Sequence, residues 1–360
     1  MMKIVASLVW FLSMSLFASQ TQGFIDYYIA PSSAYLDWST PKTTLNSYIS
    51  SALNNGLLNP SKNRYRTGLG HSWVHFDCML PNGEKASAWS GISGESNPKY
   101  SYSLMAKDGI GLNILRYGFR DGFIQNEEVV KGGIATYLGR KDVDNEGNIV
   151  RLRPMFMRFE ISPSQCLEVK RFYSAFNSRT KKQTPTYEDV ASYNDSELLY
   201  YALNIDSYES YMQNGPEGKL GGGCTSYSTS VLKVAGVYPK SLDYFFQREV
   251  QASPTLFGNE KNKVSLQSIL LGKKGDSWIK EDHEKTESIL FYDPEKIFQF
   301  MHSVYTCTTK GTTIDICPLL VQDWLVQNNL KVEILKNEVE GKYHGNKMKN
   351  VIDGFKFIKL

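Results

Sequence analysis

The stretch GGGCTSYSTSVLKVAGVYP, residues 221–239, places a cysteine directly after three glycines and before a segment of helical character. Apolar or aromatic residues fall three, seven, ten and eleven positions after Cys224, which is the spacing of one helix face. They are Tyr227, Val231, Val234 and Ala235. Gly236 and Pro239 give the expected stop, so the sequence predicts a short helix over 225–235 with Cys224 at its opening.

A cysteine at a helix start is suited to act as a nucleophile. The unpaired N–H groups there carry about half a positive charge and can lower a thiol pKa from about 8.5 into the range of about 3.5 to 7.5. Glycines before the cysteine let a second backbone or a substrate come close. The alternative interpretation of Cys224 is structural, because a lone cysteine is often packed as a small apolar side chain.

The first 20 residues read as a secretory signal peptide. Lys3 precedes an uncharged run over 4–18, and small and polar residues follow at 18–20. That run is short for a membrane span, and no later segment approaches about twenty uninterrupted apolar residues. We therefore expect a secreted or periplasmic protein with no integral membrane segment after signal removal.

The charge balance argues against a nucleic-acid partner. The 360 residues include 40 basic and 37 acidic ones, for a net charge of +3, without a long basic run interleaved with aromatic residues. The length suggests two domains, or one domain with a large extension. We expect a domain over 21–240 and a C-terminal extension of unknown role over 241–360.

Five cysteines in an exported chain leave at least one thiol unpaired. Cys307 and Cys317 bracket a short polar stretch and are the pair expected to form a disulfide. Cys78 and Cys166 form either a second disulfide or two packed thiols. Cys224 is the cysteine left over.

Alternating residues over 71–78, a turn at 81–83 and a second run over 85–92 predict a β-hairpin. A strand over 155–161 leads into a helix that begins with a capping box formed by Ser162 and Gln165. Weaker patterns predict strands over 116–123 and 133–138, and helices over 197–203, 294–305 and 318–328.

A thiolate nucleophile needs a base, and the candidates are His71 and His75. His71 follows Gly70 and opens the hairpin strand, where a ring can project beyond the sheet edge toward a helix start, so it is the preferred base. His75 lies on the same face of the predicted strand as His71, so it either lines the same surface or faces solvent. A rival arrangement is a metal site formed by His71, His75 and Asp77, but paired histidines four apart that bind zinc usually lie on helices. We expect no metal and no cofactor.

Three segments together resemble the circularly permuted papain-like (NlpC-type) cysteine hydrolases. They are GLGHSWVHFDC at 68–78, MFMRFEISPSQCLEVKRFYSAF at 155–176 and GGGCTSYSTSVLKVAGV at 221–237. In papain the cysteine helix precedes the histidine strand, and in the permuted members the order is reversed, as here. The resemblance covers roughly 67–239 and implies an α+β fold in which an antiparallel sheet packs against helices, here with a C-terminal extension.

The resemblance implies that Cys224 is the nucleophile and His71 the base. The family commonly places a third polar residue on the strand after the histidine, and this chain offers several candidates whose choice stays open. They are Ser87, Ser90, Glu84 and His75. The long insertion over 97–154 departs from the family pattern.

The expected function is hydrolysis of an amide or peptide bond, in a cell-wall peptide or an isopeptide, through a Cys224 thioester. A thiol acyltransferase or lipid hydrolase acting on an acyl substrate would use the same thioester. A non-catalytic secreted binding protein on the same scaffold is the third class. The sequence does not indicate an oligomeric state.

Overall fold

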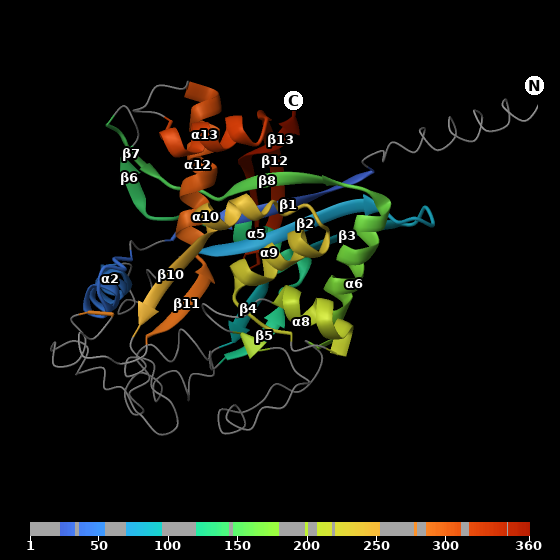
Figure 1. Ribbon diagram of the computed structural model, residues 1–360, viewed down its shortest axis with the longest axis horizontal. Helices are drawn as coiled ribbons and strands as arrows, with labels where there is room; N and C mark the ends of the chain where they lie inside the picture. Colours follow the sequence, from blue (N-terminus) through green and yellow to red (C-terminus); the bar gives the residue numbers. More distant parts are fainter. Residues whose placement is uncertain are drawn as a thin grey trace, which may run out of the picture.

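The fold is that of a computed structural model of the chain (Figure 1). The structure describes residues 22–32, 36–54, 70–95, 120–143, 147–179, 199–200, 207–217, 220–252, 277–278, 286–310, 317–343 and 345–360. Within these ranges, no helix has both the length and the apolar character needed to cross a bilayer. The predicted signal peptide lies outside the described residues.

A six-stranded sheet in the described part of the chain has the order β12-β13-β8-β1-β2-β3. Its strands are β1 (Gly23–Ala30), β2 (His71–Met79), β3 (Lys85–Ser90), β8 (Met155–Ile161), β12 (Leu330–Tyr343) and β13 (Asn346–Lys359). Neighbouring strands are antiparallel except β13 and β8, which run parallel. The α+β class is confirmed, but the sheet is mixed, so the prediction of an antiparallel sheet is wrong at this one junction.

Strand β1 lies in the middle of the sheet, between β8 and β2. Consecutive side chains from Tyr27 to Ala30 are fully buried, because helices cover both faces of the sheet. A strand buried on both faces shows no polar alternation, which is why periodicity alone does not reveal it.

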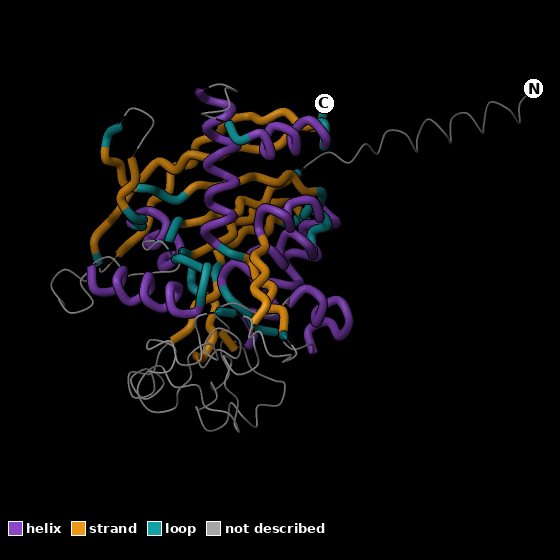
Figure 2. Tube along the Cα trace, turned by 60° about the vertical axis from the view of Figure 1, so that its left-hand side comes forward, coloured by secondary structure: helices purple, strands orange, loops and turns teal. Residues whose placement is uncertain are grey.

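The helices α6 (Pro163–Arg179), α9 (Cys224–Val234) and α12 (Pro294–Lys310) pack on one face of the sheet, and α5 (Glu127–Thr136) packs on the other. Tyr27 of β1 belongs to the first core, whereas its neighbour Tyr28 belongs to the second. Figure 1 shows α9 alongside β2, and in Figure 2 the helix tubes lie against the stacked strands. The sheet is therefore the middle layer of three.

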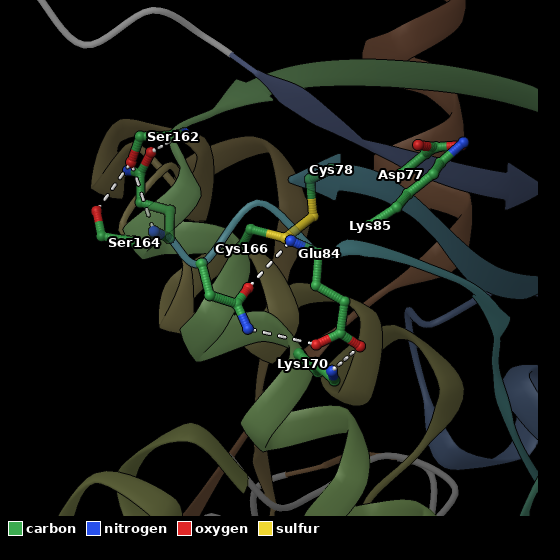
Figure 3. Close-up of a disulfide and its surroundings, with 10 residues drawn as sticks. Asp77, Cys78, Glu84, Lys85, Ser162, Ser164, Cys166 and Lys170 are labelled. Carbon is green, nitrogen blue, oxygen red and sulfur yellow. Dashed lines mark hydrogen bonds and ion pairs between the residues drawn. A yellow bond between two sulfur atoms is a disulfide. The ribbon is translucent and has the colours of Figure 1, made fainter. Parts of the chain in front are cut away.

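Two local predictions are confirmed at the end of the sheet drawn in Figure 3. Strands β2 and β3 form the predicted hairpin. The capping box forms as well, because the Ser162 N–H donates to Gln165 Oε1 at 2.8 Å and the Gln165 N–H donates to Ser162 Oγ at 3.4 Å. Cys78 and Cys166 are joined by a disulfide, which resolves the open alternative and ties β2 to α6 (Figure 3).

The predicted disulfide between Cys307 and Cys317 is confirmed, with the two Cα atoms 4.8 Å apart. It links the last turns of α12 to the start of α13 (Leu319–Gln327). These two helices also confirm the helical predictions over 294–305 and 318–328.

Two weaker predictions are wrong. The structure places residues 133–138, predicted as a strand, in the end of helix α5 and the segment after it. The helix forms there because the Asn126 side chain caps it and because its glycines pack closely on other elements. Of the predicted helix 197–203, residues 199–200 form strand β9, and the other residues lie outside the described ranges. The predicted strand 116–123 is confirmed from residue 120 onward as β5.

Shorter elements complete the described chain. The helices are α2 (Pro41–Asn54), α8 (Ser207–Asn214) and α10 (Asp243–Phe246), and 3₁₀ turns lie at Gly215–Glu217 and Lys240–Leu242. One small sheet contains β4 (Ile92–Glu95), β5 (Arg120–Ile124) and β9 (Leu199–Tyr200). Two further sheets pair β10 (Gln247–Ala252) with β11 (Glu287–Tyr292) and β6 (Lys141–Val143) with β7 (Ile149–Arg151).

The segment 241–360, expected as a C-terminal extension, contributes α12, β12 and β13 to the central sheet and its core. Strand β12 also supports α5, since a Cβ on Gly341 would lie 2.4 Å from the Gly132 nitrogen. A backbone approach this close requires glycine on both elements.

Candidate active site

The loop before α9 is buried and held by hydrogen bonds. Ser207 Oγ contacts the Gly221 carbonyl oxygen and accepts the Gly221 N–H at 3.2 Å. Gly222 has φ 128°, a conformation that side-chain-bearing residues rarely adopt, and Gly223 is the N-cap of α9 without a capping side chain. The helix therefore begins directly at Cys224, as predicted, with its first N–H groups not capped by a side chain.

Two contacts fix α9 against the neighbouring elements. Ser72 Oγ of β2 donates to Ser228 Oγ at 3.0 Å, and Thr225 Oγ1 donates to the Tyr292 carbonyl oxygen at 2.7 Å. Cys224 itself is 6% exposed and is the cysteine that takes no part in a disulfide. The thiol is thus held at a fixed position where α9 meets the first residues of β2.

His71 is the first residue of β2 and pairs with Ala30, the last residue of β1. The structure brings its ring within hydrogen-bonding distance of the Cys224 thiol. The backbone N–H groups of Ser72 and Thr225 also hydrogen-bond to the thiol. The two residues expected to act as nucleophile and base are therefore adjacent, although 153 positions of sequence separate residues 71 and 224.

Opposing effects act on the pKa of Cys224. Burial is the largest, and by itself it would raise the pKa, because it disfavours the charged thiolate. The charge of His71, its hydrogen bond and the N–H groups of Ser72 and Thr225 favour the thiolate. Together they outweigh burial and hold the pKa of Cys224 below its ordinary value.

Gln125 contacts the His71 ring and orients it. No pattern in the sequence indicates this residue. Its Oε1 accepts the Trp73 indole N–H at 2.9 Å and lies 3.3 Å from His71 Nε2. An indole nitrogen only donates, so the Gln125 atom must be the oxygen, and an amide oxygen only accepts, so His71 must carry a proton on Nε2. In the neutral ring, Nδ1 is then the nitrogen that can take the thiol proton.

The structure places His75 away from Cys224. Four residues along a strand separate its Cα from that of His71 by about 13 Å. The His75 ring stacks on Trp89 with centroids 4.0 Å apart, and its Nδ1 lies 3.9 Å from the buried carboxylate of Asp26. His75 is therefore not brought together with the Cys224–His71 pair.

The other candidates for the third residue are engaged elsewhere. Ser90 Oγ hydrogen-bonds the Tyr227 hydroxyl at 2.7 Å, Glu84 pairs with Lys170 at 3.3 Å, and Ser87 is exposed on β3. Asp77 of the rival metal arrangement pairs with Lys85 at 2.9 Å (Figure 3). In the ranges that the structure describes, no group of three or more His, Cys, Asp or Glu side chains is placed to hold a metal ion.

A cavity of about 230 Å³ lies elsewhere, at the opposite end of β1 from His71. It is lined by Gly23, Phe24, Arg158, Glu160, Leu335 and Lys356. The Arg158 guanidinium next to it is already held by the Asp26 carboxylate at 2.6 and 2.7 Å. Its Lys356 amine is likewise paired, with Glu160 at 2.9 Å, so the charged groups that line this cavity are already engaged in ion pairs.

Comparison of the chain with protein-family models, with curated proteins and with solved structures found no match in any of the three. The functional argument consequently depends on the residues of the site.

Proposed function

We propose that this protein is an exported cysteine hydrolase that cleaves an amide or peptide bond through a thioester on Cys224. The observation that carries the proposal is the hydrogen bond between His71 and a Cys224 thiol whose pKa is lowered despite burial. A thiolate next to an oriented imidazole is the arrangement that nucleophilic catalysis by cysteine requires.

Each residue of the site has a role in this mechanism. Cys224 Sγ attacks the substrate carbonyl carbon, and the backbone N–H of Cys224 donates to the oxygen on which charge develops. His71 holds the thiol proton and delivers it to the leaving amine, and Gln125 keeps the ring in the required tautomer. Water then hydrolyses the thioester with His71 as the base.

Two further observations favour an exported hydrolase of the permuted papain-like kind. The histidine strand precedes the cysteine helix in the chain, which is the order of the permuted members. The two disulfides are typical of proteins in an oxidising compartment, where a cell-wall peptide or isopeptide is an accessible substrate.

The first test is alkylation of the unreduced protein by iodoacetamide, with the modified residue identified by mass mapping. Because the pKa of Cys224 is lowered, its thiolate persists as the pH falls below about 8.5, where an ordinary thiol becomes unreactive. We expect rapid alkylation of Cys224 at mildly acidic pH, and His71→Ala should move the rise in rate to higher pH. His75→Ala is the matched control from the same strand and should leave the profile unchanged.

The second test uses purified muropeptides as the substrate. Cys224→Ser should abolish hydrolysis, His71→Ala should slow it by about 100- to 10,000-fold, and EDTA should have no effect. Full activity of Cys224→Ser would show that the thiol is not the nucleophile.

A further inference from the structure

Tyr137 follows α5 directly and lies beside Trp73. Its backbone N–H donates to the Gly133 carbonyl oxygen at 3.0 Å, which fixes the residue at the helix end. Its ring meets the Trp73 ring edge-on, with the centroids 6.2 Å apart. Because Trp73 shares the Gln125 oxygen with His71, Tyr137 belongs to the immediate surroundings of the Cys224–His71 pair.

The hydroxyl of Tyr137 has an unusual environment. Its oxygen is buried, and among the described residues no hydrogen-bond partner reaches it. Buried polar atoms in proteins nearly always have a partner, so an exception requires an explanation. The charges of Cys224 and Glu295 both act on the hydroxyl, and each raises its pKa.

Glu295 is already engaged by other groups. Its Oε1 lies 2.7 Å from Arg140 Nη2, and its Oε2 accepts the Ser32 N–H at 3.2 Å. Cys224, next to which charge would develop during acyl transfer, is the other group whose charge acts on the Tyr137 hydroxyl. The Tyr137 hydroxyl is thus a buried hydrogen-bond donor in the surroundings of the Cys224–His71 pair. Acyl transfer at this pair would supply an acceptor, the negatively charged oxygen of the substrate.

We propose that Tyr137 donates its hydrogen bond to the substrate carbonyl oxygen as that oxygen becomes negatively charged, together with the backbone N–H of Cys224. This inference rests on the proposed role of Cys224 as the nucleophile. A donor that is fixed in place and has no partner in the resting site gives up no hydrogen bond when the oxyanion forms. Burial, with smaller contributions from the charges at Cys224 and Glu295, raises the pKa of the Tyr137 phenol, so the donor keeps its proton at neutral pH.

The step balances as an ordinary acyl transfer. The thiolate of Cys224 forms a bond to the carbonyl carbon, and the π electrons of the carbonyl move to its oxygen. Tyr137 stabilises that oxygen by a hydrogen bond without giving up its proton. When the carbonyl re-forms, the bond to the leaving group breaks, and an amine leaving group takes its proton from His71.

The test compares two reagents on the full chain. p-Nitrophenyl acetate acylates a thiolate through an oxyanion, whereas iodoacetamide alkylates it by direct displacement with no oxyanion. We expect Tyr137→Phe to slow p-nitrophenolate release by about 100- to 1,000-fold, the effect of losing one oxyanion donor, and to leave the alkylation rate of Cys224 unchanged.

Tyr27→Phe is the matched control. Tyr27 is also buried, its charge interacts with Cys224, and its hydroxyl likewise has no hydrogen-bond partner among the described residues. Its hydroxyl faces Thr229 and Ser72, whereas Tyr137 lies against Trp73, so both rates should stay at the wild-type level in Tyr27→Phe. The assignment to Tyr137 would be overturned by a loss of acylation in Tyr27→Phe, or by an equal loss of acylation and alkylation in Tyr137→Phe. Unchanged acylation in Tyr137→Phe would also overturn the assignment to Tyr137, but it would leave the proposed role of Cys224 intact. Slow reaction of the wild-type protein with both reagents would overturn the proposed function and this inference together.

Discussion

Gln125 determines which nitrogen of His71 faces the thiol. The Cys224 sulfur is nearly buried, and burial alone would keep it neutral, so the thiolate depends on a correctly oriented imidazole. Gln125 supplies that orientation through an oxygen that Trp73 holds in place. Removing the acceptor would free the ring to rotate and to exchange tautomers.

The prediction for Gln125 compares two substitutions. Gln125→Leu keeps the volume but loses the acceptor, and we expect alkylation of Cys224 and hydrolysis to slow by about 10- to 100-fold, as when groups that orient a metal-bound histidine are removed. Gln125→Glu keeps an oxygen that can accept from both Trp73 and His71, so this variant should retain most of the wild-type rates of alkylation and hydrolysis. Equal losses in the two variants, measured by iodoacetamide kinetics, would indicate a merely structural residue.

The sequence predicts Cys224 and His71 as a candidate pair because each has a local signal. A helical period and three glycines mark Cys224, and strand alternation with a preceding glycine marks His71. Gln125 has neither, since its role comes from meeting Trp73 and His71 across 52 and 54 positions of sequence. No single-sequence pattern encodes such a tertiary contact. No sequence pattern indicates Tyr137 either, because its place beside Trp73 is also a tertiary contact.

At the scale of elements, helix α5 is the least predictable part of the site. Its sequence EEVVKGGIAT combines β-branched residues with two adjacent glycines, which favour strand or turn over helix. The glycines have a packing role, because a Cβ on Gly132 would lie 2.2 Å from the Lys342 carbonyl oxygen and one on Gly133 would lie 3.3 Å from the Trp73 ring. Tertiary packing thus overrides the local propensity.

The two disulfides differ in what they connect, and this difference leads to a stability prediction. The Cys78–Cys166 bond closes a loop with a sequence separation of 88, whereas the Cys307–Cys317 separation is 10. Chain entropy assigns about 4.6 kcal/mol to the longer loop and about 2.7 kcal/mol to the shorter one. Replacing Cys78 and Cys166 by alanine should therefore lower the free energy of unfolding more than replacing Cys307 and Cys317, as measured by urea denaturation. An equal or reversed order would contradict the entropic account.

At the scale of the whole molecule, the C-terminal hairpin is part of the sheet that carries the site. Strand β13 pairs with β8, and Asn337 of β12 donates to the buried carboxylate of Asp26 at 2.7 Å. The same hairpin packs against α5, and the residues that flank α5 are Gln125 on one side and Tyr137 on the other. Residues on both sides of the boundary expected at 240 therefore form one sheet.

Gly341→Ala tests this coupling between the hairpin and the site. The added methyl would meet the Gly132 nitrogen at 2.4 Å, so α5 or β12 must shift. We expect a loss of about 1–3 kcal/mol in the free energy of unfolding. Since Gln125 precedes α5 and Tyr137 follows it, the shift should also slow acylation of Cys224 by p-nitrophenyl acetate, by up to about 100-fold for a displacement near 1 Å. Lys342→Ala removes an exposed side chain from the same strand together with its surface ion pair to Glu128 of α5 at 3.6 Å, and because such exposed pairs contribute little it should leave both quantities nearly unchanged. A destabilised Gly341→Ala protein that acylates at the wild-type rate would mean that the hairpin supports the fold without positioning the site.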